Sequence, residues 1–151
     1  MGLPPQELGR FGPENPGTKH ALTGMRILIC DDEPHIADTI AEHLEACGHR
    51  CIVRHSAGEA LRVLDAEPEA IGLVITDLCM PDRDGLRLTD GVRERGLTMP
   101  VALMTAHPLP GSNERLAERG VSVVLRKPLH LTDLEAIAAS ARTLHRMRQT
   151  P

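Results

Sequence analysis

Aromatic side chains are almost absent from this chain of 151 residues, which contains one Phe (Phe11) and no Tyr or Trp. Leu, Ile, Val, Met and Ala must therefore fill the core, where aromatic rings usually supply much of the buried area. Proteins that bind single-stranded nucleic acid stack bases on aromatic rings, and proteins anchored at a membrane interface use Trp or Tyr. The composition argues against both classes.

A surplus of basic residues is also lacking. The 17 Lys and Arg residues are outnumbered by 21 Asp and Glu, which gives a net charge of -4. We therefore expect no direct contact with nucleic acid. No apolar run is long enough to cross a membrane, and the N-terminus has no charged segment followed by an apolar one. These observations predict a cytoplasmic protein with reduced thiols and no membrane contact.

The chain has four cysteines and only two lysines. Cys47 and Cys51 are separated by three residues, which allows a metal site, but no second pair of Cys or His follows at the spacing of zinc ligands. Ordinary half-buried thiols are the favoured interpretation. Lys19 and Lys127 are the only lysines, and all other basic residues are Arg. Lys127 reflects either composition bias or a need for a compact ammonium group.

The chain divides into three parts. Residues 1–24 are rich in Pro and Gly and have no apolar periodicity, so we expect a disordered tail, with a docking segment around Phe11 as the alternative. Regular apolar patterns run from residue 25 to residue 147 and predict one domain. Residues 148–151 are expected to form a short C-terminal tail.

Five short apolar runs predict five buried strands, and each is followed by a helical pattern. The strands are expected at residues 26–30, 50–54, 72–76, 101–104 and 121–125. The first helix is expected to begin at Pro34 and end at Gly48, with an apolar face of Ile36, Ile40, Leu44 and Cys47. This alternation is typical of an α/β fold whose parallel sheet is covered by helices on both faces.

Capping and turn residues mark the other helices. Ser56 and Glu59 are spaced as a capping box, and so are Thr132 and Glu135 before the last helix. The dipeptide at 84–85, Asp-Gly, predicts a turn ahead of the third helix, and the fourth helix is expected around residues 114–119. The last helix is expected to bury five residues: Leu134, Ile137, Ala138, Ala141 and Leu144.

Charged and polar residues stand where four of the strands end. Asp31 and Asp32 follow the first strand, Asp77 follows the third, Thr105 ends the fourth and Lys127 follows the fifth. The carboxyl ends of parallel strands meet at one edge of the sheet, where ligands bind in such folds. Three carboxylates repel one another there unless a cation neutralises them, and oxygen ligands favour Mg²⁺. The sequence therefore predicts a Mg²⁺ site at this edge.

Four segments, ILICDDEP, LVITDLCMPDRDG, VALMTAH and VVLRKP, resemble the motifs of the receiver domain of bacterial two-component response regulators. The resemblance covers roughly residues 25–146. It implies a flavodoxin-like (βα)5 fold, a doubly wound parallel sheet with strand order 2-1-3-4-5, which agrees with the pattern of strands and helices.

The resemblance also implies a metal-dependent phosphorylation site. Asp77 would be the phosphoacceptor, taking a phosphoryl group from a phosphohistidine of a partner. Asp32, Asp77 and the backbone carbonyl of Cys79 would ligate Mg²⁺, and Asp31 would orient a metal-bound water. Lys127 would pair with Asp77 and then with the phosphoryl oxygens.

Further residues would respond to phosphorylation or modulate it, again by the resemblance. Thr105 would donate its hydroxyl to a phosphoryl oxygen, Ala106 is small enough to allow phosphoryl access, and the bond before Pro128 is expected to be cis. His107 and Cys79 would flank the water that hydrolyses the phosphoryl group. Val124 departs from the family, because the family usually carries an aromatic switch residue at this position. Either an aliphatic residue serves there without consequence, or phosphorylation is relayed by loop repacking alone or couples weakly to the output surface.

The function expected is that of a phosphoryl-accepting response regulator receiver in a two-component phosphorelay. It would catalyse only its own phosphotransfer and dephosphorylation, act as a monomer or weak dimer, and be of the stand-alone type. Its partners would be a sensor histidine kinase or a histidine phosphotransfer protein, and a downstream protein target. The alternatives are a receiver fragment of a hybrid kinase or transcription factor, an interaction module independent of phosphorylation, and a Mg²⁺-dependent phosphohydrolase. The last is disfavoured because Cys79 stands where such enzymes place a second Asp.

Overall fold

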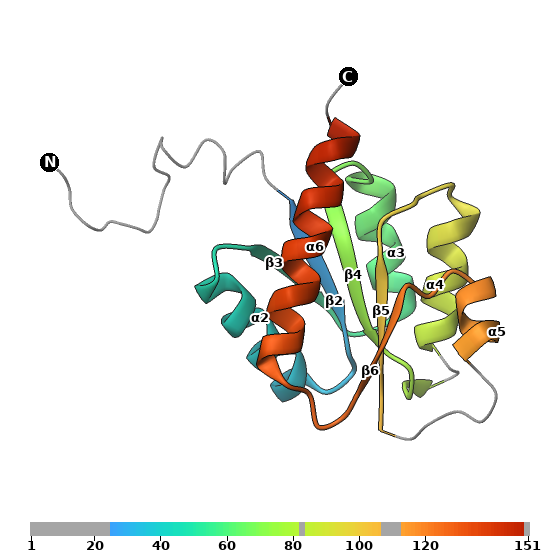
Figure 1. The fold of residues 1–151 in the computed structure, drawn as a ribbon. Coiled ribbons are helices and arrows are strands. Elements are labelled where there is room, and N and C mark those ends of the chain that lie inside the picture. Colours follow the sequence, from blue (N-terminus) through green and yellow to red (C-terminus); the bar gives the residue numbers. More distant parts are fainter. Residues whose placement is uncertain (1–24, 82–83, 107–112, 150–151) are drawn as a thin grey trace, which may run out of the picture.

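The computed structural model describes residues 25–81, 84–106 and 113–149 (Figure 1). The expected N-terminal tail, with Phe11 and Lys19, lies outside these ranges, and so do His107 and the last two residues. Among the described residues, no helix combines the length and the hydropathy that a membrane span requires.

Five parallel strands form one sheet, in the order β3-β2-β4-β5-β6. This is the predicted 2-1-3-4-5 arrangement of a doubly wound fold, and it is confirmed. The strand bounds are β2 (Arg26–Cys30), β3 (Arg50–Arg54), β4 (Ile71–Asp77), β5 (Val101–Thr105) and β6 (Val123–Arg126). Every residue of the central strand β4 is buried, as expected for a strand covered on both faces.

Helices cover both faces of the sheet, as Figure 1 shows. Their bounds are α2 (Pro34–Ala46), α3 (Ala57–Ala66), α4 (Asp84–Glu94), α5 (Asn113–Glu118) and α6 (Leu131–Gln149). Side chains alternate along β2: Ile27 and Ile29 pack with α2 and α6, whereas Leu28 and Cys30 pack with α3 and α4. A third, smaller cluster joins Leu116 of α5 to Leu103 of β5. Aliphatic side chains and Met thus fill the described core, as the composition predicts.

The capping box predicted at Ser56 is confirmed in part. The Ser56 hydroxyl accepts the Glu59 N–H at 3.2 Å and caps α3. The Glu59 carboxylate accepts the N–H of His55 at 3.2 Å, one residue before the expected Ser56 N–H. The N–H groups of Glu59 and His55 are thus both hydrogen-bonded where β3 ends. The chain therefore turns directly into α3.

Two predicted helix starts are wrong. Residues 84 and 85 lie in the first turn of α4 and do not form a separate turn ahead of it. The first turn of α6 closes on the carbonyl of His130, which accepts the N–H of Asp133 at 3.0 Å, so Thr132 lies inside the helix and is not its cap. Glu135, the other half of the supposed box, instead hydrogen-bonds His43 of α2.

Three predictions about the ends and faces of elements also need correction. Cys47 follows the last residue of α2 and is exposed, since the chain turns away there at Gly48, whose φ is 96°. Leu144 is 45% exposed, because the buried stripe of α6 passes through His145 instead. β6 begins at 123 and not at 121, because the N–H of Val121 still donates to the Leu116 carbonyl at 2.9 Å, in the turn that closes α5. The domain boundary expected at residue 147 stays a prediction, and α6 itself extends to Gln149.

Candidate functional site

The residues predicted at the strand ends lie together at the carboxyl edge of the sheet. Asp31 and Asp32 follow β2, and Asp77 is the last residue of β4. One carboxylate oxygen from each lies within 4.8 Å of the others. Asp31 and Asp77 are buried, with 0% and 4% of their surface exposed, whereas Asp32 is exposed. The cluster therefore consists of two buried carboxylates and one exposed carboxylate.

Asp31 is held in an environment that disfavours its charge. Its Oδ1 accepts the N–H of Glu33 at 2.9 Å. Its Oδ2 is buried and has no hydrogen-bond partner among the described residues. Burial, and to a smaller extent repulsion from Asp77, raises the pKa of Asp31 to about 6, although the bond from Glu33 acts in the opposite direction. The orphaned oxygen marks a place for a cation or a cation-bound water.

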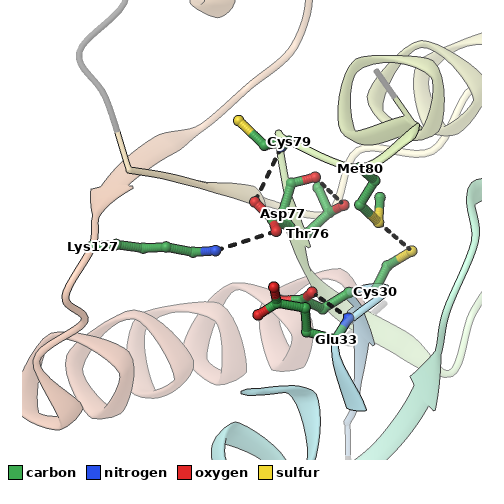
Figure 2. A network of polar contacts seen from close by, with 8 residues as sticks. Cys30, Glu33, Thr76, Asp77, Cys79, Met80 and Lys127 are labelled. Carbon is green, nitrogen blue, oxygen red and sulfur yellow. Dashed lines mark hydrogen bonds and ion pairs between the residues drawn. The ribbon is translucent and has the colours of Figure 1, made fainter. Parts of the chain in front are cut away.

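Asp77 is held from two sides (Figure 2). Lys127 Nζ donates to its Oδ2 at 3.2 Å, and the N–H of Cys79 donates to its Oδ1 at 3.1 Å. The Lys127 side chain extends from the end of β6 toward Asp77 and remains 23% exposed. An ammonium group on a flexible stem pairs with the carboxylate here and can also reach a ligand in front of it.

Thr105 lies at the end of β5, one residue after Met104, which pairs with Asp77 in the sheet. Thr105 is the buried last residue of β5, and Ala106 after it is exposed. The Thr105 carbonyl accepts the N–H of Lys127 at 2.8 Å, which joins the ends of β5 and β6. The peptide bond between Lys127 and Pro128 is cis, as predicted.

Val124 is half-buried and packs against the small cluster that includes Leu103 and Leu116. It lies opposite Leu103 in the β5–β6 ladder. Its aliphatic side chain thus packs at the margin of the small apolar cluster between β5 and α5. Whether it takes part in switching stays a prediction.

Sequence reasoning missed two residues that support the site. The ring Nδ1 of His55 lies 2.9 Å from the carbonyl oxygen of Asp31, and so links the end of β3 to the end of β2. Gly85 at the start of α4 lies so close to β4 that an added Cβ would meet the Asp77 carbonyl and the Leu78 Cα, the latter at 2.8 Å. The position of His55 just after a strand was a usable signal. Glycine is required at position 85 by a contact with β4, and no local sequence pattern indicates this contact.

The acidic cluster has the ligand chemistry of a hard divalent cation. All three side chains offer only oxygen, and like-charge repulsion between them disfavours the empty arrangement. The unpaired Asp31 oxygen is consistent with a metal-bound water at this point. The cluster can therefore hold a metal ion, and its donor atoms suit Mg²⁺.

Comparison with known proteins places this arrangement in a family. Residues 27–139 match the response regulator receiver domain. The chain belongs to this family. The receiver domain is a component of two-component signalling, and the flavodoxin-like fold predicted from the sequence is the one found here.

Curated relatives of this chain differ widely in length. The sensor histidine kinase RcsC of Salmonella typhi is 34% identical over 90% of this chain, and the match covers 14% of that kinase. An uncharacterised 14.6 kDa protein of Leptolyngbya boryana is 34% identical over 75% of this chain and 86% of its own length. The chain thus spans about one seventh of the kinase and most of the small protein.

Solved structures agree with the assignment. A response regulator receiver domain protein from Clostridium thermocellum superposes with a TM-score of 0.75 at 28% identity, over 82% of this chain and 98% of its own. A two-component response regulator from Clostridium difficile gives a TM-score of 0.71 at 25% identity, over 82% and 98%.

Proposed function

We propose that this receiver domain accepts a phosphoryl group on Asp77 from a phosphohistidine of a partner protein. The observation that carries the proposal is the convergence of Lys127 and two further carboxylates on Asp77 at the open edge of the sheet. A carboxylate oxygen of Asp77 attacks phosphorus and the P–N bond breaks. The electron pair leaves with the imidazole nitrogen of the donor, which then takes up a proton.

Lys127 and Thr105 assist this transfer in the proposal. The Lys127 ammonium holds the Asp77 carboxylate ready and follows the phosphoryl oxygens as negative charge moves onto the new aspartyl phosphate. Thr105, at the end of the neighbouring strand β5, donates its hydroxyl to a phosphoryl oxygen. Ala106 leaves the approach open because its side chain is small. His107 and Cys79 would set how fast water removes the phosphoryl group.

We assign Mg²⁺ to the acidic cluster. Asp32, Asp77 and the carbonyl of Cys79 would bind it directly, and Asp31 would hold one of its waters through the unpaired oxygen. When bound, Mg²⁺ neutralises charge on the phosphoryl group and on the carboxylates. The protein contributes the positions of these ligands, which are fixed by the ends of β2 and β4.

The phosphodonor protein is proposed to dock on a groove beside Lys127. This groove has a volume of about 330 Å³ and is lined mainly by apolar groups of α2, of the segment after β6 and of the start of α6. Leu131, which is 43% exposed, lines it together with Ile36 and Pro128. Lys127 lines the groove and also contacts Asp77 at the carboxyl edge of the sheet. A protein bound in the groove therefore reaches Asp77.

The remaining functional assignments are also proposals. The domain would work in the cytoplasm as a monomer or weak dimer, with a sensor histidine kinase or a histidine phosphotransfer protein as donor and a further protein as target. Its chemistry would be limited to its own phosphorylation and dephosphorylation.

The test is phosphorylation by a phosphohistidine donor and by acetyl phosphate, each with Mg²⁺, followed by intact-protein mass spectrometry. We expect one phosphoryl group per chain, sensitive to hydroxylamine and absent in Asp77→Asn. Asp38→Asn, at an exposed position on α2, is the matched control and should be phosphorylated normally. Full phosphorylation of Asp77→Asn would contradict the assignment.

The variant Leu131→Ser tests the docking groove independently of the phosphorylation chemistry at Asp77. This variant should slow transfer from the protein donor at least ten-fold and leave transfer from acetyl phosphate unchanged. Equal rates with the protein donor would refute the groove as the docking surface.

A further inference from the structure

A second group of potential metal ligands lies between α2 and α6. It consists of His43 from the last turn of α2, Cys47 directly after α2, and Glu135 from the second turn of α6. One donor atom of each residue lies within 4.8 Å of the other two. His43 Nε2 and Glu135 Oε2 already lie 2.7 Å apart. We call these three residues the α2–α6 cluster.

The α2–α6 cluster is distinct from the acidic cluster. His43 lies nine residues after Pro34, about 14 Å along the axis of α2 from the end nearest the acidic edge. No residue is shared between the two clusters, and their chemistry differs. The acidic cluster offers oxygen only, whereas this one offers one nitrogen, one sulfur and one oxygen.

Helix geometry brings the first two ligands together. His43 and Cys47 are four residues apart, and the N–H of Cys47, just past the last residue of α2, donates to the His43 carbonyl at 3.2 Å, which keeps the two side chains on one face of this final turn. Figure 1 shows α6 running beside α2, and the His43–Glu135 bond is the contact that joins them at this point. His43 is half-buried, whereas Cys47 and Glu135 are exposed, so an ion can enter from solvent.

Cys51 is not part of this site, contrary to the Cys47–Cys51 pair that the sequence allows. Cys51 lies in β3, and burial, with a smaller effect of Glu45, raises the pKa of its thiol to about 12. A thiol must lose its proton to bind a metal. Cys47 therefore has His43 and Glu135 as neighbouring donors, and Cys51 contributes none.

We propose that His43, Cys47 and Glu135 form a Zn²⁺-binding site. Zn²⁺ binds imidazole, thiolate and carboxylate ligands, and three protein ligands leave a fourth position for water. Tetrahedral coordination requires donor atoms about 3.3 to 3.6 Å apart. The His43–Glu135 pair must open by about 0.6 Å from its present 2.7 Å, a small rotation for a glutamate side chain that is 45% exposed.

Charge also favours a divalent cation in the α2–α6 cluster. Neutral His43 with a Cys47 thiolate and a Glu135 carboxylate sums to two negative charges, which Zn²⁺ cancels. Bound metal would tie α2 to α6, the two helices that follow the first and last strands. This proposal does not depend on phosphorylation of Asp77.

The test uses Co²⁺ as a spectroscopic substitute for Zn²⁺ on the full reduced chain. Excess Mg²⁺ is present throughout, so that the acidic cluster is occupied by a hard cation. A thiolate bound to Co²⁺ gives a near-ultraviolet charge-transfer band, and this band is easy to observe because the chain has no Trp or Tyr. We expect the band to saturate at one Co²⁺ per chain and to disappear when one equivalent of Zn²⁺ is added.

Single substitutions test which side chains bind the metal ion. Cys47→Ser should abolish the band, and His43→Gln and Glu135→Gln should each lower the association constant for Zn²⁺ at least ten-fold in competition with a chromophoric chelator. Cys51→Ser and Cys79→Ser are the matched controls and should bind as the unaltered chain does. The proposal is overturned if the unaltered chain gives no band, if the band survives Cys47→Ser, or if either control variant loses it. Cys47→Ser changes one exposed atom, so a lost band in that variant is not a failure to fold.

Discussion

Replacing Asp31 by Asn tests the electrostatics of the site directly. Asn has the shape of Asp, and its Oδ1 can still accept the N–H of Glu33 that Asp31 accepts at 2.9 Å. The second oxygen, buried and without a partner among the described residues, becomes an amide that can donate to Asp77. The change removes a charge that the folded state disfavours and preserves the packing around it.

The size and sign of the effect follow from the pKa of Asp31. Burial raises it from 3.8 to about 6, so the folded state binds the proton more tightly than the unfolded state does. The ionised carboxyl therefore destabilises the fold at pH 7 by about 3 kcal/mol. Solvent at the rim of the site, where Asp32 is exposed, screens the charge and lowers this to about 2 kcal/mol.

We expect Asp31→Asn to stabilise the Mg²⁺-free protein by about 2 kcal/mol at pH 7.5, measured by urea denaturation followed by circular dichroism. The gain should vanish below about pH 4, where Asp31 is protonated in both states, and rise between about pH 4 and pH 6. Saturating Mg²⁺ should shrink the gain, because it stabilises the unaltered chain more than the variant.

Asp38→Asn, an exposed position on α2, is the control and should change stability by less than about 0.5 kcal/mol at either pH. A variant that is destabilised at pH 7.5, or whose gain is the same at pH 4, would show that Asp31 carries no unfavourable charge in the folded state.

Three further predictions concern the cap, the site and the close approach of α4. Ser56→Ala should destabilise the protein by about 1 kcal/mol in urea, because it removes the bond to the Glu59 amide, whereas Thr132→Ala should cost less than about 0.5 kcal/mol. Equal losses would restore Thr132 as a cap. Lys127→Met should slow phosphorylation by acetyl phosphate about 100-fold, and a rate within three-fold of the unaltered chain would remove Lys127 from the mechanism. Gly85→Ala should destabilise by about 2 kcal/mol or more because its Cβ meets backbone, whereas Gly58→Ala, with open space, should stabilise α3 by about 0.5 kcal/mol. Calorimetric melting of both variants tests the contrast.

The reactive edge was predictable because its residues are placed by topology alone. Asp31, Asp77 and Lys127 each stand at the end of an apolar run, and parallel strands must deliver such residues to one edge. The apolar runs are long and uninterrupted enough to fix strand positions to within two residues. No knowledge of side-chain packing was needed to bring these residues together.

What the sequence could not predict depends on contacts between distant residues. Thr132 and Glu135 have the spacing of a capping box, yet Glu135 binds His43, which lies 92 residues earlier in the chain. Cys47 has the spacing of a core residue, yet α2 ends before it. In both cases the spacing of the residues fits the predicted feature, but the helix begins or ends at another residue. Tertiary packing sets these helix boundaries.

Because lysine is scarce, the Lys127 amine in the site can be labelled almost selectively. Residues 25–149 contain one primary amine on a side chain, and it is the Lys127 ammonium that contacts Asp77. Reductive methylation with ¹³C-formaldehyde would place a pair of isotope-labelled methyl groups at the reactive edge, with Lys19 and the chain terminus as the other labelled amines. The dimethylamino resonance of Lys127 would then report cation binding and phosphoryl loading in solution from within the site itself, against a nearly empty spectrum.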